Sequence, residues 1–365
     1  MTSSFTYASA GVDVAAGERA VELMRAAVAR AQRPETAGTF GGFAGLFDVT
    51  ALTRFRKPLL ATSTDGVGTK IAIARALDIH DTIGRDLVAM VVDDIVVCGA
   101  EPLFLTDYIA VGRVHPQRIA DIVRGIADGC VAAGCALLGG ETAEHPGLME
   151  PDEYDVAGAG TGVVEADDLL GSHRVRVGDV AIAFASSGLH SNGYSLARAV
   201  LLEHAQLDLD QHIDDLGRTL GEELLEPTRI YALDCLALAR DASAGLHALT
   251  HITGGGLAAN IARVLPEALS LQVDRSTWTP PPIVDLIATS GPVDRSELEH
   301  TLNMGIGMLA FVDPSGVDHS LALLANRGVK AWVVGAVTER QPGEHGDATA
   351  KGGAGGAVRL INDYR

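Results

Sequence analysis

The amino-acid sequence predicts a mixed α/β (α+β) fold divided into two domains. At 365 residues, the chain is longer than one hydrophobic core usually serves. Strand-like and helix-like apolar patterns alternate along both halves, with glycine-rich turns between them. A polar stretch at residues 165–173 interrupts that pattern. We therefore expect domains at residues 1–170 and 171–340, followed by a glycine-rich tail at residues 341–365.

The spacing of apolar residues predicts the elements of the first domain in order. Apolar residues repeat at helical spacing within residues 18–32 and stop before Pro34, which disfavours helix at the residue preceding it. The remaining runs predict strands at residues 59–63, 103–111, 135–138 and 156–164, and helices from residue 71, at 82–97 and at 116–133.

The second domain is predicted in the same way. Strands are expected at residues 180–184 and 247–252, and helices up to Leu202 and over residues 257–264. Residues 341–356 are low in complexity, so we expect them to be flexible and to carry no chemistry. In the first domain, residues 38–47 combine four glycines with three phenylalanines. Both a flap over a ligand and a packed loop remain open for this segment.

Composition excludes several classes of partner. The formal net charge of −19 disfavours nucleic acid and anionic membranes, because both require a positive field. No stretch is long and apolar enough for a membrane helix, and the N-terminus lacks a basic region followed by an apolar one. A cytoplasmic location is therefore expected. The four cysteines form no CxxC pair, which favours buried free thiols over a zinc site.

An anion-binding turn is predicted at residues 63–70. This segment places Asp65, Gly66, Gly68 and Lys70 directly after a short apolar strand. Backbone N–H groups at such a turn attract anions, and an ammonium group adds positive charge. The spacing differs from that of a P-loop. An ordinary glycine turn with a solvated lysine remains the alternative.

Carboxylates in apolar surroundings form a second candidate group. Asp86, Asp93 and Asp94 interrupt the apolar helix predicted at residues 82–97. Burying unpaired acids is costly, so a metal or cationic partner is favoured over a solvated face. Glu141 follows a strand and two glycines, where a metal ligand and an exposed loop carboxylate both remain open. Hard carboxylate oxygens suit Mg²⁺, and Mg²⁺ suits ATP.

Six motifs along the chain occur in the order found in one enzyme family. They are Asp65-Gly66-Val67-Gly68-Thr69-Lys70, Gly99-Ala100-Glu101-Pro102-Leu103, Gly139-Gly140-Glu141-Thr142-Ala143-Glu144, Gly188-Leu189-His190-Ser191-Asn192-Gly193-Tyr194-Ser195-Leu196, Pro227-Thr228-Arg229-Ile230-Tyr231 and His251-Ile252-Thr253-Gly254-Gly255-Gly256-Leu257. By these motifs the sequence resembles the phosphoribosylformylglycinamidine cyclo-ligase family, also called AIR synthetases. The resemblance extends from Tyr7 to Met308, which is nearly the whole chain.

The resemblance implies an ATP-dependent ligase of de novo purine biosynthesis. Such an enzyme closes the ring of formylglycinamidine ribonucleotide to give 5-aminoimidazole ribonucleotide, with release of ADP and phosphate. ATP is then a co-substrate and Mg²⁺ a cofactor, because phosphoryl transfer depends mainly on positioning and charge neutralisation. The resemblance also implies a homodimer, in which the N-terminal sheets of two subunits combine into a barrel with a C-terminal α/β domain beside each.

The resemblance further assigns roles to individual residues. Those expected to hold Mg²⁺, and through it ATP, are Asp65, Asp94 and Glu141. Those expected to hold the phosphates of ATP are Gly66, Val67, Gly68, Thr69 and Lys70. Those expected to bind the amide substrate are His190, Ser191, Asn192, Thr253, Gly254 and Gly255. Those expected to take part in catalysis are Lys70, Asp94 and His190, the last by orienting substrate or moving a proton.

Alternatives remain for two of these groups. His190 could instead have a structural hydrogen-bonding role, and residues 253–256 could form a tight structural turn rather than an anion nest for the ribose 5′-phosphate. The sequence also departs from the family pattern at three positions. Asp93 stands where asparagine is common, Arg25 where lysine is expected, and His145 where methionine is usual.

Other functions share the expected ATP-binding architecture. They include selenophosphate synthetase, thiamine-monophosphate kinase, the hydrogenase-maturation dehydratase and formylglycinamidine ribonucleotide synthetase. Selenophosphate synthetase would need a reactive cysteine near the N-terminus, whereas the first cysteine is Cys98. A nucleotide-responsive binding protein without turnover is an alternative of a different class, and the presence of His190 and Lys70 argues against it.

Overall fold

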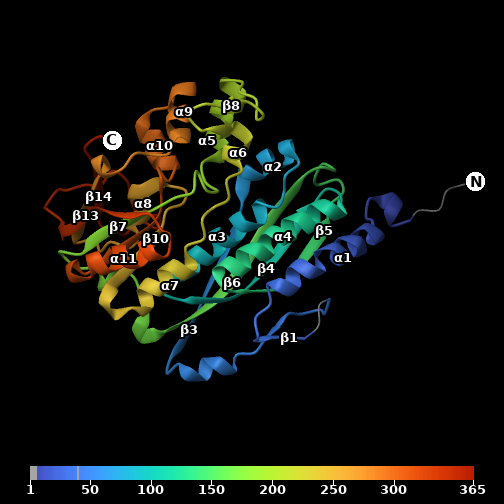
Figure 1. Cartoon of the computed structure of the whole chain (residues 1–365), viewed down its shortest axis with the longest axis horizontal. Helices are drawn as coiled ribbons and strands as arrows, with labels where there is room; N and C mark the ends of the chain where they lie inside the picture. The colour runs from blue at the N-terminus through green and yellow to red at the C-terminus, as the bar shows by residue number, and fades with distance from the viewer. Residues whose placement is uncertain (1–5, 39–40) are drawn as a thin grey trace, which may run out of the picture.

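The chain forms two β-sheets, each with helices packed against it (Figure 1). The computed structural model describes residues 6–38 and 41–365. Strands of the first sheet lie within residues 58–165, and those of the second lie within residues 180–361. The mixed α/β fold in two parts is confirmed. Of the predicted segment 38–47, residues 39 and 40 lie outside the described residues.

The N-terminal sheet has four strands in the order β3-β6-β4-β5. Their bounds are β3 (Pro58–Gly66), β6 (Tyr154–Glu165), β4 (Glu101–Val111) and β5 (Ala136–Glu144). β6 pairs antiparallel with both β3 and β4, whereas β4 and β5 are parallel. The helices of this half are α1 (Val14–Arg30), α2 (Ile71–Leu77), α3 (Ile83–Val96) and α4 (Pro116–Ala133). A short hairpin joins β1 (Thr36–Ala37) and β2 (Leu46–Phe47).

Helix α3 lies close against the sheet because β6 presents glycine at every second position. A Cβ atom added at Gly160 would lie 2.7 Å from Val91 Cγ1, and one added at Gly162 would lie 2.5 Å from Ile95 Cγ2. Val91 and Ile95 are four residues apart and therefore share one face of the helix. The glycines thus allow α3 to approach the strand at a distance that any larger residue would increase.

The C-terminal sheet has six strands in the order β10-β12-β7-β13-β11-β14. Their bounds are β10 (Leu246–His251), β12 (Ile306–Val312), β7 (Val180–Ala185), β13 (Ala331–Glu339), β11 (Leu269–Asp274) and β14 (Ala357–Ile361). Only the edge pair β11–β14 is parallel among these neighbours. The prediction of a separate tail at residues 341–365 was wrong at its end, because β14 joins the sheet and buries Ala357 and Val358.

Helices and one further hairpin surround the six-stranded sheet. The helices are α5 (Tyr194–Arg198), which continues as a π-helical turn at Ala199–His204, α6 (Leu220–Leu224), α7 (Ala232–Arg240), α8 (Gly256–Ala262), α9 (Pro282–Ser290), α10 (Arg295–Thr301) and α11 (Val317–Asn326). The hairpin of β8 (His212–Ile213) and β9 (Arg218–Thr219) lies near α6 (Figure 1). In the described residues, no helix is long and apolar enough to cross a membrane.

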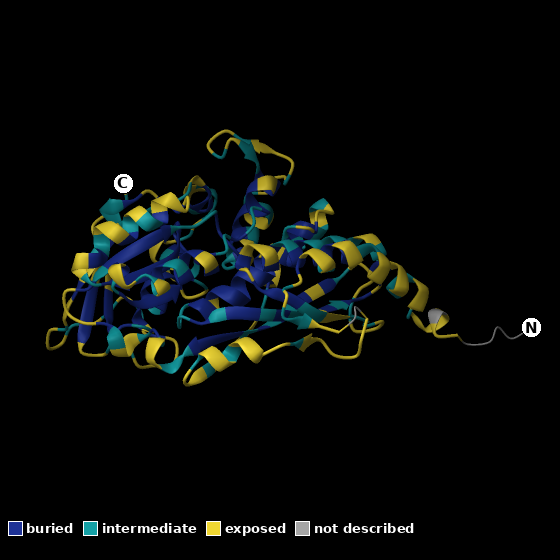
Figure 2. Cartoon of the chain, turned by 60° about the horizontal axis from the view of Figure 1, so that its bottom comes forward, coloured by how far each residue is buried: buried dark blue, intermediate teal, exposed yellow. Residues whose placement is uncertain are grey.

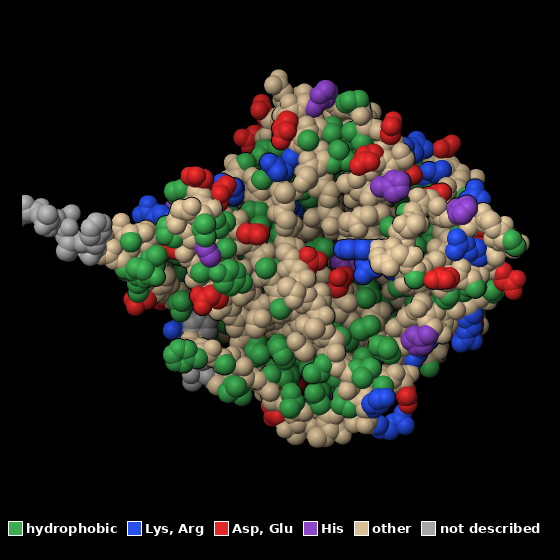
Figure 3. Space-filling model, turned by 180° about the vertical axis from the view of Figure 1, so that it is seen from behind, with side chains coloured by type: hydrophobic (Ala, Val, Ile, Leu, Met, Phe, Trp, Pro, Cys, Tyr) green, Lys and Arg blue, Asp and Glu red, His purple; other side chains and the backbone are tan. Residues whose placement is uncertain are grey.

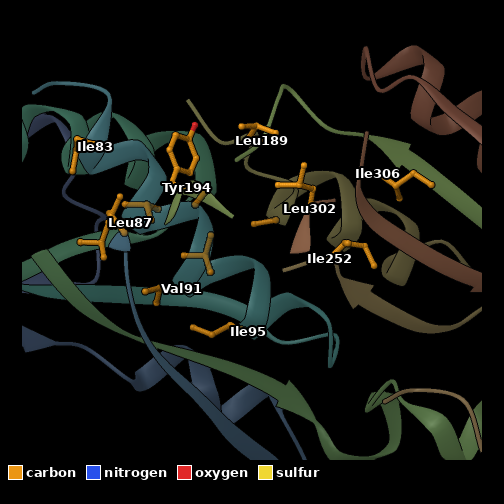
Figure 4. Packing of buried hydrophobic residues seen from close by; sticks show 14 of the residues in the cluster. Ile83, Leu87, Val91, Ile95, Leu189, Tyr194, Ile252, Leu302 and Ile306 are labelled. Carbon is orange, nitrogen blue, oxygen red and sulfur yellow. The ribbon is translucent and has the colours of Figure 1, made fainter. Parts of the chain in front are cut away.

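The larger of two clusters of buried apolar residues spans both halves, and most of the apolar residues of α3 belong to it. Along α3, only Arg85 and Asp94 are not buried. Figure 4 shows the α3 side chains Ile83, Leu87, Val91 and Ile95 in a row beside apolar residues of the C-terminal half. A helix that is apolar on nearly every side must be covered on every side. The side chain of Asp94 is therefore unusual for this helix, because it is partly exposed at a point between the two halves.

The sheet face opposite α3 is partly exposed (Figure 2). Alternate side chains of β3 and β4 point to this face, and Leu60 and Tyr108 are 67% and 42% exposed there. A sheet face that carries exposed apolar side chains commonly marks an interaction surface.

Candidate functional site

A carboxylate pair and a histidine meet where the two halves of the chain come together. Asp65 is the last residue but one of β3, Asp94 lies on α3, and His251 ends β10. His251 Nδ1 lies 2.9 Å from Asp94 Oδ1, and because a carboxylate only accepts, the ring nitrogen donates. The Asp94 side chain is 39% exposed, whereas that of His251 is 2% exposed. This arrangement points one free carboxylate oxygen of Asp94 toward the surface between the halves.

The charges of this cluster alter the ionisation of its members. Burial raises the pKa of Asp65, and the neighbouring charge of Asp94 raises it further. Burial alone would lower the pKa of His251, but the hydrogen bond to Asp94 and the charges of the nearby acids raise it overall. Two close carboxylates that repel each other would bind a cation more readily than a neutral ligand.

Two of the three predicted metal ligands are brought together, and the third is not. Across the sheet, Asp65 pairs with Gly158, Gly158 with Asp107, and Asp107 with Gly140, which precedes Glu141. Three strand spacings of about 4.8 Å therefore separate Glu141 from Asp65. Glu141 also lies within β5 rather than after its end. Among residues 6–38 and 41–365, no three His, Cys, Asp or Glu side chains are grouped as a metal site.

The donor set nevertheless fits Mg²⁺ bound together with a nucleotide. Mg²⁺ usually keeps several waters and takes one or two protein carboxylates plus substrate phosphates. Asp65 and Asp94 supply two such carboxylates, and Asp94 is open to solvent.

The predicted anion-binding turn directly follows Asp65. Gly68 has a φ of +73°, a conformation that glycine adopts without strain, and both Gly68 and Thr69 are exposed. Val67 is buried, so only its backbone could contact a ligand. The Thr69 hydroxyl lies 3.1 Å from that of Ser195 in the C-terminal half. The turn therefore places backbone N–H groups beside the carboxylate pair, although that of Gly66 already donates to Asp65 Oδ1 at 2.8 Å.

Lys70 does not fit the phosphate contact predicted for it. Its side chain is completely buried, and the ammonium group donates to Asp86 at 2.9 Å, to the His190 carbonyl at 3.2 Å and to the Glu226 carbonyl at 2.6 Å. An ammonium group has three N–H donors, and these three contacts use all of them. The motif places a lysine next to the turn, but its ammonium group points into the protein, where it contacts the buried Asp86.

His190 is held with one ring nitrogen occupied and the other without a protein partner. The Ser187 backbone N–H donates to His190 Nε2 at 3.1 Å, so in the neutral ring the proton is on Nδ1. His190 Nδ1 is buried and has no hydrogen-bond partner within the described part of the chain. Burial first, and then the charges of His251, Lys70 and Arg229, lower the pKa of His190 well below its ordinary value. His190 is therefore a neutral hydrogen-bond donor.

The two predicted substrate segments lie next to each other. A Cβ atom added at Gly254 would lie 3.3 Å from Asn192 Oδ1, which places residues 190–192 beside residues 253–255. Ser191 is mostly buried, and its hydroxyl lies 3.2 Å from that of Thr228. Of these residues, Asn192 is the one whose amide lies at the junction of both segments.

A single asparagine organises the turn at residues 253–256. The Asn260 side-chain amide donates to the carbonyls of Thr253 and Gly256 at 3.1 and 2.9 Å, and it lies 3.4 Å from that of Gly254. Gly255 has a φ of +102°. The Gly256 N–H donates to the Thr253 carbonyl at 3.1 Å, so only N–H groups earlier in the turn could serve another partner.

Comparison with known proteins identifies the family. The AIR synthase related protein N-terminal domain matches residues 48–164, and the AIR synthase related protein C-terminal domain matches residues 176–347. The phosphoribosylformylglycinamidine cyclo-ligase of a Geobacillus species is 48% identical over 333 residues, which cover 91% of this chain and 95% of the relative. That of Anaeromyxobacter dehalogenans is 49% identical over 342 residues, with coverage of 93% and 98%. The chain belongs to the phosphoribosylformylglycinamidine cyclo-ligase family.

Solved structures of more distant proteins share the fold. Thiamine-monophosphate kinase from Stenotrophomonas maltophilia has a TM-score of 0.65 at 18% identity, covering 95% of this chain and 97% of that chain. The hydrogenase maturation protein HypE of E. coli has a TM-score of 0.62 at 21% identity, covering 93% and 92%. At these identities the likeness concerns the fold alone.

Several residues at or near the candidate site were not singled out from the sequence. His251 and Asn260 lie in or near a quoted motif, but their contacts depend on α3 and on the turn folding back. Lys351 belongs to the tail that was predicted to carry no chemistry, yet its positive charge acts on Asp65 and opposes the rise of its pKa. Lys351 also lies beyond the residues that the family model matches. Figure 3 shows Lys or Arg side chains beside acidic ones in the hollow between the halves.

The three departures from the cyclo-ligase pattern have different surroundings. Asp93 is completely buried and accepts the Tyr231 backbone N–H at 3.0 and 3.2 Å. His145 Nε2 lies 3.1 Å from the Tyr108 hydroxyl. Arg25 lies on the exposed side of α1.

Proposed function

We propose that this chain catalyses the ATP-dependent closure of formylglycinamidine ribonucleotide to 5-aminoimidazole ribonucleotide in de novo purine biosynthesis. The observation that carries this proposal is 48–49% identity to relatives named for that activity over more than nine-tenths of the chain. The Asp65–Asp94 pair beside an exposed glycine turn supports it. A fold neighbour, HypE, has a structure in complex with ATP. A cytoplasmic location accords with this role.

The reaction requires the amide oxygen to become a leaving group. ATP transfers its γ-phosphoryl group to the formyl oxygen, which leaves as phosphate when the amidine nitrogen attacks the same carbon and closes the ring. In this proposal the turn at Gly66–Thr69 binds phosphates through the backbone N–H groups that follow Gly66, since that of Gly66 donates to Asp65. Asp65 and Asp94 would hold Mg²⁺, which would neutralise phosphate charge. Lys70 is not assigned a phosphate contact.

The amide substrate is placed at the junction of residues 190–192 and 253–255. His190 donates from Nδ1 and orients the amide, since Nε2 is already occupied and the ring is neutral. The turn at Thr253–Gly255 accepts the ribose 5′-phosphate through its backbone N–H groups. Asn192 lies between these two contacts.

A defined assay tests the activity. Purified protein with ATP and Mg²⁺ is expected to release ADP and phosphate only when formylglycinamidine ribonucleotide is added, with one aminoimidazole product formed per ADP. Coupled ADP detection and a colour reaction for the aminoimidazole measure both. Hydrolysis of ATP without the substrate, or ADP release without product, would contradict the proposal.

We also propose that the chain acts as a homodimer joined through the open face of the N-terminal sheet. Leu60 and Tyr108 are exposed on this face, and the net charge of −19 makes a nucleic acid an unsuitable partner. Because Glu141 lies three strands from Asp65 within one protomer, a role for Glu141 at the same ion would require the second protomer.

Sedimentation velocity tests the homodimer. The full chain is expected to sediment at twice its 37.9 kDa mass, and Leu60→Glu is expected to shift it toward the monomer, because a buried charge opposes association. Val177→Glu, at a position in the C-terminal half that is 54% exposed, serves as the matched control. Equal sedimentation of both variants and the wild type would exclude this face as the interface.

A further inference from the structure

Lys70 and Asp86 form a buried ion pair at the junction of the two halves. Neither side chain is exposed, and Lys70 Nζ lies 2.9 Å from the Asp86 carboxylate. Asp86 Oδ1 also accepts the Thr228 backbone N–H at 2.7 Å and the Thr228 hydroxyl at 2.6 Å. Lys70 and Asp86 belong to the N-terminal half, whereas Thr228 and the carbonyls that Lys70 contacts belong to the C-terminal half. The pair therefore connects segments far apart in sequence.

From this pair, hydrogen bonds lead in two directions to His190. Directly, Lys70 donates to the His190 carbonyl at 3.2 Å. Indirectly, Asp86 holds Thr228, and the residues on either side of Thr228 hold Ser187: the Ser187 hydroxyl donates to the Pro227 carbonyl at 2.7 Å and accepts the Arg229 N–H at 3.1 Å. Ser187 N–H then donates to His190 Nε2. The ion pair thus contacts both the backbone and, through Ser187, the ring of His190.

The backbone of His190 needs such support. Its φ is +64°, in the left-handed region that residues with a side chain rarely adopt. A residue in that conformation persists only when its surroundings fix it. The hydrogen bond from Lys70 to the His190 carbonyl holds the backbone, and the hydrogen bond from the Ser187 N–H to Nε2 holds the ring.

Stability alone is a poor explanation for this ion pair. Apolar residues of similar volume often replace a buried ion pair with no loss of stability, whereas removal of one partner is strongly destabilising. The position of the pair is more specific, because it holds Thr228, and the neighbours of Thr228 hold Ser187, which contacts His190 Nε2.

We propose that the Lys70–Asp86 pair is a positioning device that holds His190 in its left-handed conformation, with Nδ1–H directed at the substrate. Because Lys70 directly follows the turn at Gly66–Thr69, the same pair links the nucleotide-binding turn to the amide-binding loop. This inference rests on the role proposed above for His190. Lys70 and Asp86 are positioning residues in this scheme and do not touch either substrate.

The test uses the full-length double variant Lys70→Met/Asp86→Asn. Methionine keeps most of the volume of the lysine side chain, and the asparagine carbonyl can still accept from Thr228, so no unpaired charge is left buried. The control is Arg275→Met/Glu299→Gln, which removes another ion pair, at 2.8 Å and mostly buried, within the C-terminal half. Thr228→Val, which removes only the hydroxyl donor to Asp86, serves if the double variant does not fold.

The first readout is the histidine tautomer, from ¹⁵N spectra of protein labelled at its 12 histidines. The His190 signal is assigned by its loss in His190→Gln. In the wild type and the control, this signal is expected to show a neutral ring with the proton on Nδ1. In the double variant it is expected to shift toward the average of both tautomers. An unchanged signal in the double variant, or in Thr228→Val if that variant is used, would overturn the proposal.

The second readout is the kinetics of ring closure. The double variant is expected to lose about 10- to 100-fold in kcat with less than threefold change in the KM for ATP, since misplaced catalytic groups affect the transition state most. A double variant whose His190 signal shifts toward the average of both tautomers but whose kcat is unchanged would also overturn the positioning role. Full turnover by His190→Gln would instead contradict the proposed role of His190, while the tautomer signal would still test the ion pair.

Discussion

Replacing Asp94 by asparagine is expected to lower kcat by about 10²- to 10³-fold, the range typical for loss of one preorganised electrostatic group. Asp94 is the half-exposed carboxylate of an otherwise buried helix, and one of its oxygens accepts from His251. The amide could keep that hydrogen bond but would supply no negative charge for Mg²⁺. Steady-state kinetics over a range of Mg²⁺ concentrations measure the effect.

The expected pattern separates Asp94 from its neighbours. Asp65→Asn is expected to lower turnover at least tenfold and to raise the Mg²⁺ concentration needed for half-maximal rate, because Asp65 shares the same ion. Asp318→Asn, on an exposed position of α11, serves as the control and is expected to leave kcat unchanged. A wild-type rate and Mg²⁺ dependence in Asp94→Asn would remove Asp94 from the site.

Replacing Asp93 by asparagine is expected to stabilise the protein, and to do so more at high pH than at low pH. Burial raises the pKa of Asp93 from 3.8 to about 7. As pH rises from about 4 to 7, the unfolded chain loses this proton readily while the folded chain resists losing it. The folded state is therefore penalised by up to about 4 kcal/mol once the pH exceeds the folded pKa. Asparagine carries no such penalty.

Urea unfolding at two pH values measures this effect. The gain in unfolding free energy of Asp93→Asn is expected to be about 2–3 kcal/mol larger at pH 8 than at pH 5. Asp318→Asn, at an exposed position of α11, serves as the control and is expected to show no such difference. An equal effect of Asp93→Asn at both pH values would show that the Asp93 carboxyl group does not change its protonation on folding in this pH range.

Local pattern predicted the elements more reliably than their ends. The apolar run at residues 82–97 became α3 almost unchanged, since a long helix carries many periodic residues. The strand predicted at residues 135–138 continues to Glu144, because pairing with β4 extends it through the glycines. Residues 341–365 were expected to form a separate tail, but their last part, β14, pairs with β11 and buries Ala357 and Val358. The flexibility expected for residues 341–356 stays a prediction.

For the candidate site, too, the sequence predicted some positions and missed others. The family resemblance placed Asp65 and Asp94 at one site, and in the structure Asp94 lies near enough for its charge to act on Asp65. Glu141 was expected with them, but strand order places it at the opposite edge of the sheet. His251 was overlooked because its partner Asp94 lies 157 residues away in sequence.

For the turn at residues 63–70, the sequence alone determined its chemistry: a carboxylate, exposed backbone N–H groups and a cation after a strand. The family resemblance likewise followed from the sequence, since motif order is a property of the chain. Only the tertiary structure decided where the charges point. Asp86, 16 residues further on, turns the Lys70 ammonium inward, because a buried carboxylate requires a cation more strongly than a solvated turn does. Side-chain direction depends on such distant partners, and local spacing carries no information about them.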